Sequence, residues 1–318
     1  MSAPLIDVRL RQIRLEGEGI TSYEFVSATD AVLPAFSAGA HIDLHLPHDM
    51  VRSYSLVNAP SDAGRYLIAV YREHEGRGGS AWMHSSPRVG DVLRISAPSN
   101  DFPLEENAAH SIFIAGGIGV TPVMSMLHRL DELGRAWRLH YASRSAREAA
   151  FVDELRGMQH GAGEVEFCFG TSRTARLDID AIVRDAAADC HLYCCGPSRM
   201  IDAFIAACAS RPASTVHVER FAASSEAATE GGFDVVLQRG GQRFAVRPGK
   251  SILDTLLENA IDVPYACTAG VCGTCRTKVL QGEPDHRDDY LSADEKRANQ
   301  SMMICCSGSR SKTLVLDL

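Results

Sequence analysis

Short segments of alternating hydrophobic and polar residues fill the first 100 positions of the chain. Gly, Pro, Asp and Asn separate these segments, as expected for strands joined by turns. Six strands are predicted, over 5–13, 22–26, 41–46, 52–56, 66–71 and 91–96, with one short helical stretch at 80–84. This pattern predicts a small antiparallel β-barrel.

Between about 110 and 221 the hydrophobic period changes. Apolar runs now alternate with stretches in which apolar residues recur every three to four positions. Strands are predicted over 111–115, 137–142, 165–169, 191–195 and 215–218, with helices over 123–133, 151–155, 179–188 and 200–208. Alternating strands and helices predict an α/β domain with a parallel, doubly wound sheet.

A stretch without large apolar side chains, 222–232, follows this region and predicts a flexible linker. Beyond it, 233–237 and 243–246 flank Gly240-Gly241 as a hairpin, and Ser251 begins an amphipathic helix. The chain is therefore expected to divide into domains at 1–105, 106–221 and 233–318.

Composition and charge exclude several classes of protein. The chain has 318 residues, 45% of them hydrophobic and 23% charged, with a formal net charge of -8. These values are ordinary for a folded globular protein, and no basic face predicts nucleic acid or an anionic membrane as a partner. No apolar run of transmembrane length and no leader peptide is recognised, so a cytoplasmic protein without membrane contact is expected.

Ten cysteines are present, and in the cytoplasm they are expected to be reduced. Cys267, Cys272 and Cys275 have the Cys-x4-Cys-x2-Cys spacing, and Cys305 follows 30 positions later. This is the spacing of plant-type 2Fe-2S sites. A zinc site is the alternative, although zinc usually takes cysteines in pairs two to four residues apart.

Cys306 competes with Cys305 for the fourth ligand position. Residues 291–295 begin a capped helix, and 302–304 then form a strand that ends at Cys305. We therefore assign the metal ligands as Cys267, Cys272, Cys275 and Cys305. The other cysteines lie in apolar contexts, where a small buried thiol is the usual role.

Two motifs in the barrel region indicate a flavin site. Arg52-Ser53-Tyr54-Ser55 offers an aromatic ring to stack on an isoalloxazine, a hydroxyl to bond the ring and a guanidinium for a phosphate. Alone, this tetrapeptide also suits an ordinary edge strand. Gly76-Arg77-Gly78-Gly79-Ser80 precedes a short helix, so its N–H groups and the Ser80 hydroxyl can face an anion.

A nucleotide site is indicated in the α/β region. Gly116-Gly117-Ile118-Gly119-Val120-Thr121-Pro122 follows a buried strand and predicts a strand–turn–helix phosphate cradle, with Thr121 as N-cap and Pro122 as the first helical residue. Cys195-Gly196-Pro197 follows a second strand. After the strand at 137–142, Ser143-Arg144 supplies no acid for a ribose 2′-hydroxyl, whereas Arg144 or Arg147 suits a 2′-phosphate, so NADPH stays possible.

In their order along the chain, these motifs resemble those of the ferredoxin reductase superfamily. The C-terminal region, including His286-Arg287-Asp288, is similar to that of the phthalate dioxygenase reductase family, the class IA reductases of Rieske oxygenase systems. The resemblance covers essentially the whole chain. It implies an FMN-binding barrel at 1–105, an NAD-binding α/β domain at 106–221 and an α+β plant-type ferredoxin domain at 233–318.

The resemblance also implies roles for individual residues. In the family, the thiol matching Cys195 lies beside the nicotinamide C4 and the aromatic ring matching Phe221 lies over the flavin; Thr121 completes the expected catalytic set. The implied cofactor-binding residues are Arg52, Ser53, Tyr54, Ser55, Ala69, Gly76, Gly78, Gly79, Ser80, Gly116, Gly117, Gly119, Thr121, Pro122, Ser143, Arg144, Cys195, Gly196, Pro197 and Phe221.

Three such sites in one chain imply one order of electron flow. A hydride carries two electrons and a 2Fe-2S cluster accepts one, whereas a flavin accepts two and releases them singly. We therefore expect electrons to pass from NADH through FMN and the cluster to a terminal Rieske oxygenase that hydroxylates aromatic rings or removes O-methyl groups, with the reductase a monomer. The alternatives are a stand-alone NAD(P)H oxidoreductase serving another acceptor, such as a haem protein, and a non-catalytic iron–sulfur redox sensor.

Overall fold

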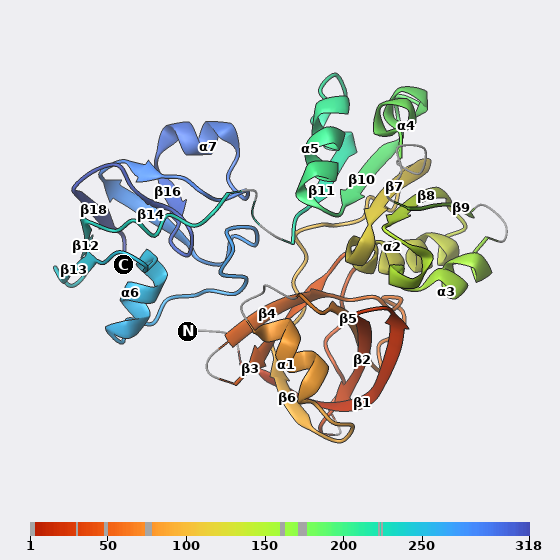
Figure 1. Ribbon diagram of the computed structural model, residues 1–318, viewed down its shortest axis with the longest axis horizontal. Coiled ribbons are helices and arrows are strands. Elements are labelled where there is room, and N and C mark those ends of the chain that lie inside the picture. The colour runs from red at the N-terminus through yellow and green to blue at the C-terminus, as the bar shows by residue number, and fades with distance from the viewer. Residues whose placement is uncertain are drawn as a thin grey trace. The chain divides into compact units, whose positions relative to one another are not determined.

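The computed structural model describes residues 4–29, 31–47, 50–73, 78–159, 163–170, 177–221, 223 and 225–318. The chain forms two compact units, of which the first ends at Glu219 and the second is Arg220–Leu318. Figure 1 colours the first unit from red to green and the second from cyan to blue. Among the described residues, no helix has the length and apolar character needed to cross a bilayer.

The first unit begins with an antiparallel sheet of six strands in the order β4-β3-β6-β1-β2-β5. Its elements are β1 (Ile6–Gly17), β2 (Ile20–Ser27), β3 (His41–Leu46), β4 (Met50–Ser55), β5 (Tyr66–Tyr71), α1 (Gly79–Ser85) and β6 (Val92–Ile95). The edge strands β4 and β5 also contact each other, so the sheet curls into the predicted barrel. Alternate residues such as Val8, Leu10, Ile42 and Leu44 fill its interior.

The same unit continues with a parallel sheet in the order β11-β10-β7-β8-β9, which confirms the predicted α/β fold. Its strands are β7 (His110–Gly116), β8 (Ala136–Ser143), β9 (Gly163–Phe169), β10 (His191–Cys195) and β11 (Val216–Glu219). Its α-helices are α2 (Val120–Glu132), α3 (Val152–Gly157), α4 (Ile179–Asp185) and α5 (Ser198–Ala207). The helices α2 and α3 cover one face of the sheet, and α4 and α5 cover the other (Figure 1).

The order of the parallel strands predicts where a ligand binds. From β7 the chain proceeds outward to β8 and β9, then returns to the other side of β7 to form β10 and β11. The strand order therefore reverses between β7 and β10. Ligands of open α/β sheets bind beyond the carboxyl ends of the strands at such a point.

The second unit is built on a mixed sheet in the order β13-β12-β18-β14-β16, with a separate pair, β15 and β17. Its elements are β12 (Phe233–Leu237), β13 (Arg243–Val246), α6 (Ile252–Glu258), β14 (Arg276–Gln281), β15 (Pro284–Asp285), α7 (Ala293–Ala298), β16 (Ser301–Met303), β17 (Gly308–Ser309) and β18 (Thr313–Leu316). Both helices begin with capping boxes, at Ser251 and Ser292. This α+β sheet domain agrees with the expected ferredoxin fold.

The end of the segment expected as a linker packs on the second unit. Ala228 is buried, and its N–H donates to the carbonyl of Cys306 at 2.7 Å. The carbonyl of Thr229 accepts the N–H of Gly249 at 2.7 Å. The domain bounds given above stay predictions, and these contacts show that Ala228 and Thr229 belong to the folded part of the second unit.

Candidate functional site

The turns after β7 and β10 touch each other at the carboxyl edge of the parallel sheet. A Cβ on Gly119 would collide with the backbone carbonyl of Cys195, and one on Gly116 would lie 2.6 Å from Cδ of Pro197. Gly117 has a φ of 54°, and a Cβ there would meet no neighbour. The structure thus brings the two predicted nucleotide motifs, including Gly196, together at the reversal of strand order, where the nucleotide crevice is expected.

The start of α2 differs from the prediction at Thr121. Gly117–Gly119 forms a 3₁₀ turn that runs directly into the helix, whose N-cap is Gly119. Thr121 is therefore already the second helical residue, and its buried hydroxyl donates to the carbonyl of Ile118 at 2.9 Å. The N-cap prediction for Thr121 is wrong, and Pro122 is the third helical residue rather than the first.

A buried thiol and a carboxyl group meet where β10 and β11 end. Sγ of Cys195 donates to Oε2 of Glu219 at 3.9 Å. Burial raises the pKa of the Cys195 thiol, while burial and the nearby charge of Asp101 raise the pKa of Glu219 to about 8. Both groups are therefore mainly uncharged at pH 7. The neighbouring Cys194 packs into the apolar core on the opposite face of the sheet.

Sequence reasoning did not identify Glu219. Its only local signal is an acid at the end of a short strand, and such acids are usually solvated. The contact with Cys195 depends on the parallel register of β10 and β11, which pairs these two residues directly.

In the barrel, Arg52 lies across the start of α1. A Cβ on Gly79 would lie 2.7 Å from Nε of Arg52, and Gly78 is the helix N-cap with a φ of 84°. Alternation along β4 places the half-buried Tyr54 on the same face of the strand as Arg52. The structure therefore brings together a guanidinium, two glycines and an aromatic ring; Gly76 lies outside the described residues.

The other predicted flavin residues have different surroundings. Ser53 lies on the opposite face of β4 and donates to Oδ1 of Asp43 at 2.6 Å. The Ser80 hydroxyl accepts the backbone N–H of Glu73 at 3.1 Å. Ser55 is buried at the end of β4.

Two further residues of the predicted set also lie apart from this group. Ala69 is buried in the apolar core beside Ile20 and Val57. Phe221 belongs to the second unit, where its side chain is 42% exposed, and its position over a flavin stays a prediction.

In the second unit, four thiols lie as two pairs. The thiol of Cys267 hydrogen-bonds to that of Cys272, and the thiol of Cys275 hydrogen-bonds to that of Cys305. The hydrogen bond from Cys272 and two backbone N–H groups lower the pKa of Cys267 to about 7, whereas thiol pairing and burial raise the pKa values of Cys272 and Cys275. The thiolate is the form of cysteine that binds metals, and two pairs of thiols suit a cluster of two irons with four cysteine ligands.

The loop that carries three of these thiols folds closely on its surroundings. Gly270 has a φ of 74°, and a Cβ there would collide with Sγ of Cys306. Gly273 has a φ of 77°, and a Cβ there would collide with the ring of Tyr290. The thiol of Cys306 interacts with that of Cys305 and lies 3.8 Å from the carbonyl oxygen of Met303, so the choice of Cys305 as the fourth ligand stays a prediction. The donor set and the loop therefore fit a 2Fe-2S cluster.

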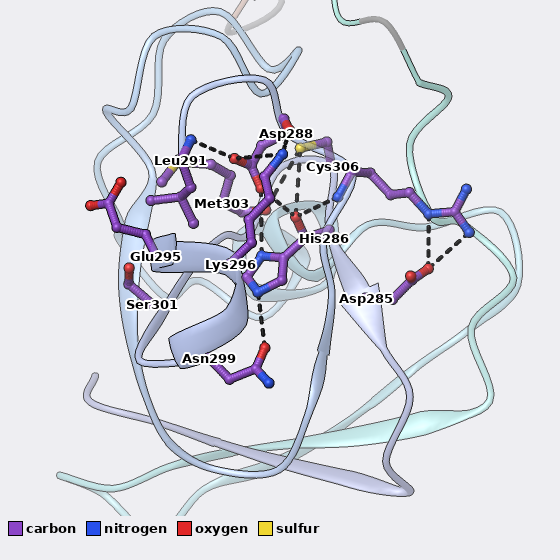
Figure 2. Close-up of polar contacts among 12 residues, drawn as sticks. Asp285, His286, Asp288, Leu291, Glu295, Lys296, Asn299, Ser301, Met303 and Cys306 are labelled. Atoms are coloured by element: carbon purple, nitrogen blue, oxygen red, sulfur yellow. Dashed lines mark hydrogen bonds and ion pairs between the residues drawn. The ribbon is translucent and has the colours of Figure 1, made fainter. Parts of the chain in front are cut away.

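A buried polar network lies beside this loop (Figure 2). The fully buried carboxylate of Asp288 accepts the N–H of Leu291 at 2.8 Å and the hydroxyl of Ser307 at 3.4 Å. Nδ1 of His286 lies 3.6 Å and Nζ of Lys296 lies 3.9 Å from the same carboxylate. Four groups from three segments of the chain are thus gathered around one carboxylate.

The network connects the two parts of the thiol site. The N–H of Asp289 donates to the carbonyl of Gly270 in the thiol-bearing loop at 3.0 Å. Ser307, bonded to Asp288, lies two residues after Cys305. Asp288 therefore lies between the loop and the strand end that carries the fourth thiol.

Comparison with known proteins extends this picture to the whole chain. A 2Fe-2S iron–sulfur cluster binding domain matches residues 235–309, and an oxidoreductase NAD-binding domain matches residues 113–205. Phenoxybenzoate dioxygenase subunit beta from Ectopseudomonas oleovorans is 48% identical, over 98% of this chain and 97% of that protein. Tetrachlorobenzoquinone reductase from Sphingobium chlorophenolicum is 46% identical, over 98% of each.

A solved structure agrees over the same length. Phthalate dioxygenase reductase, a modular structure for electron transfer from pyridine nucleotides to a 2Fe-2S cluster, superposes with a TM-score of 0.81 at 36% identity, covering 99% of this chain and 98% of that one. Both units of the chain therefore have counterparts in one protein. The chain belongs to the phthalate dioxygenase reductase family, the NADH-dependent flavin and iron–sulfur reductase components of oxygenase systems.

Proposed function

We propose that this chain delivers electrons from NADH, through FMN and a 2Fe-2S cluster, to a terminal Rieske-type oxygenase. The observation that supports the proposal is that one chain holds both the contact between the glycine-rich turn after β7 and the turn at Cys195 and the paired thiols of Cys267, Cys272, Cys275 and Cys305. A bound flavin supplies the conversion between two-electron and one-electron transfer that these two sites require. Hydroxylation or demethylation of the organic substrate is then left to the oxygenase.

Residues of the barrel hold the FMN in this proposal. Arg52 and the N–H groups around Gly78 and Gly79 bind the phosphate, because a guanidinium and unpaired N–H groups at a helix start both favour an anion. Tyr54 stacks on the isoalloxazine ring and Ser55 hydrogen-bonds to it. Ser53 and Ser80 stabilise the loops through their own hydrogen bonds.

Residues of the crevice orient the nicotinamide nucleotide. The glycine turn after β7 lets the pyrophosphate approach the backbone, and Thr121 stiffens that turn through its bond to Ile118. Cys195 lies beside the nicotinamide, and its protonated thiol adds no charge there. Glu219, which is also mainly protonated at pH 7, fixes the thiol by a hydrogen bond.

We also propose a cytoplasmic monomer with three domains. All ten cysteines are free of disulfides, which suits a reducing compartment. The four cluster thiols belong to the second unit alone, and the nucleotide crevice belongs to the first. The residues proposed for each redox site thus all come from one copy of the chain.

An anaerobic visible spectrum of the purified holoprotein tests the electron path. One equivalent of NADH is expected to bleach both the flavin and the iron–sulfur bands. Flavin bleaching without any change in the iron–sulfur bands would contradict transfer between the two sites. A protein that contains iron and sulfide but no flavin would favour the redox-sensor alternative.

Tetrachlorobenzoquinone reductase favours a second candidate, reduction of a small quinone. Such an acceptor needs no docked protein, so its rate would not respond to an oxygenase. NADH oxidation is therefore to be compared with 1,4-benzoquinone and with a purified Rieske oxygenase as acceptors. Turnover with the quinone alone would identify the second function.

A further inference from the structure

The structure brings an acid to the end of β8, where the sequence predicts only cations. In doubly wound sheets the adenosine ribose lies beyond the second strand, and an acid there binds its 2′-hydroxyl, whereas an arginine accommodates a 2′-phosphate. Here β8 is the second strand beside the glycine-rich turn, and Arg144 follows its last residue, Ser143. Glu148 comes five residues after the strand, too distant in sequence for the local pattern to identify it.

Arg144 is already paired in this position. Its Nη2 lies 3.0 Å from Oε1 of Glu148 and donates to the hydroxyl oxygen of Tyr71 at 3.2 Å. The Glu148 side chain is 25% exposed and that of Arg144 is 65% exposed, so both can reach a ligand. The cation that would favour a 2′-phosphate is therefore neutralised by a neighbouring carboxylate.

The segment that carries Glu148 is held in place. A 3₁₀ turn, Ala146–Glu148, begins at Ser145, whose hydroxyl accepts the N–H of Glu148 at 3.4 Å. The carbonyl of Arg147 accepts the N–H of Glu18 from the β1–β2 turn at 2.7 Å. A Cβ on Gly17 would lie 3.1 Å from the same carbonyl oxygen, so the two turns are in close contact.

We infer that Glu148 makes this chain select NADH over NADPH. Its carboxylate accepts the 2′-hydroxyl of NADH, holds Arg144 in an ion pair and repels the 2′-phosphate of NADPH. A repulsive group against the wrong ligand is a general source of specificity. The inference rests on the proposed function, because it concerns the coenzyme that supplies the electrons.

Coenzyme preference in the holoenzyme tests this inference. Initial rates with NADH and NADPH are measured with ferricyanide as acceptor in the wild type and in Glu148→Gln. The variant is expected to gain about tenfold or more in kcat/KM for NADPH, mainly through KM, and to lose less for NADH. Gln keeps the size and hydrogen-bonding capacity of the side chain and removes only the charge.

Two further variants separate charge from folding. Glu154→Gln removes an exposed carboxylate that pairs with His128 in the same domain, and it is expected to leave the coenzyme ratio unchanged. Combining Glu148→Gln with Arg144→Gln is expected to abolish the gain with NADPH, because the freed guanidinium is the group that binds the 2′-phosphate. A gain that survives this double substitution would overturn the role of Arg144.

The result that overturns the inference is an unchanged ratio of kcat/KM values in Glu148→Gln, or an equal fall for both coenzymes. Failure of the proposed function would look different, because neither coenzyme would then bleach the flavin of the wild type. The two failures are therefore distinguishable in the same preparations.

Discussion

At Glu219, folding changes the acid–base behaviour of one side chain. Burial and the charge of Asp101 raise its pKa to about 8 from an ordinary 4.5. Between these two values the folded protein retains a proton that the unfolded chain releases. The contribution of this group to stability is therefore complete below about pH 4.5 and is lost as the pH rises to about 8.

Glu219→Gln is expected to remove this pH dependence, because an amide does not ionise. Thermal unfolding of the first unit, followed by flavin release, is measured for wild type and variant between about pH 5 and pH 9. The Tm of the variant relative to wild type should rise up to about pH 8 and then level off. Glu154→Gln, which alters an exposed acid of the same domain, serves as the control, and a difference that is constant with pH would contradict the raised pKa.

At the scale of the element, segment 286–291 connects the thiol loop to the end of β16 through the buried Asp288. Asp288→Asn keeps the shape of the side chain but removes a negative charge close to the cluster. We expect the variant to retain its iron and to have a higher midpoint potential, because less negative charge then opposes the added electron. Lys296→Met is expected to lower the potential by the same reasoning.

Redox titration followed by electron paramagnetic resonance measures both shifts. Asp294→Asn, which alters an exposed carboxylate on α7, is the matched control and should leave the potential unchanged. Shifts of the midpoint potential in opposite directions for Asp288→Asn and Lys296→Met would distinguish an electrostatic effect from a general loosening of the loop. Shifts of the same sign would show that the network acts only by supporting the fold.

The elements themselves could be predicted from the sequence because their patterns are local. The bounds of β3, β5, β10, β12 and β13 agree with the predicted ranges, since alternation along a strand directly reflects which face is buried. Thr121 could not be placed, because the 3₁₀ turn before it is shaped by contact with the Cys195 turn, 74 residues away. Glu219 escaped sequence reasoning for the same reason, because its partner Cys195 lies on a neighbouring strand. Glu148 escaped it because a 3₁₀ turn that was not predicted brings it to the nearby Arg144.

For the whole molecule, the redox sites are divided between the two units. One step of electron transfer can therefore be disrupted without the other. The crevice and the barrel lie in the unit that ends at Glu219, whereas the four thiols lie in Arg220–Leu318. Cys272→Ser alters a half-exposed thiol of one pair and leaves the first unit untouched. Hydride transfer from NADH to the flavin should therefore continue when transfer beyond the cluster stops.

Stopped-flow flavin reduction and cytochrome c reduction measure these two steps in the same protein. We expect Cys272→Ser to keep flavin reduction within about twofold of wild type while cytochrome c reduction falls by about 100-fold or more. Cys168→Ser, which alters a thiol on β9 outside the cluster, should change neither. Equal losses in both assays would mean that the flavin site depends on the second unit, because the substituted residue belongs to that unit and not to the flavin site. Loss of cytochrome c reduction alone would instead show that electrons pass from the flavin to the acceptor through the cluster.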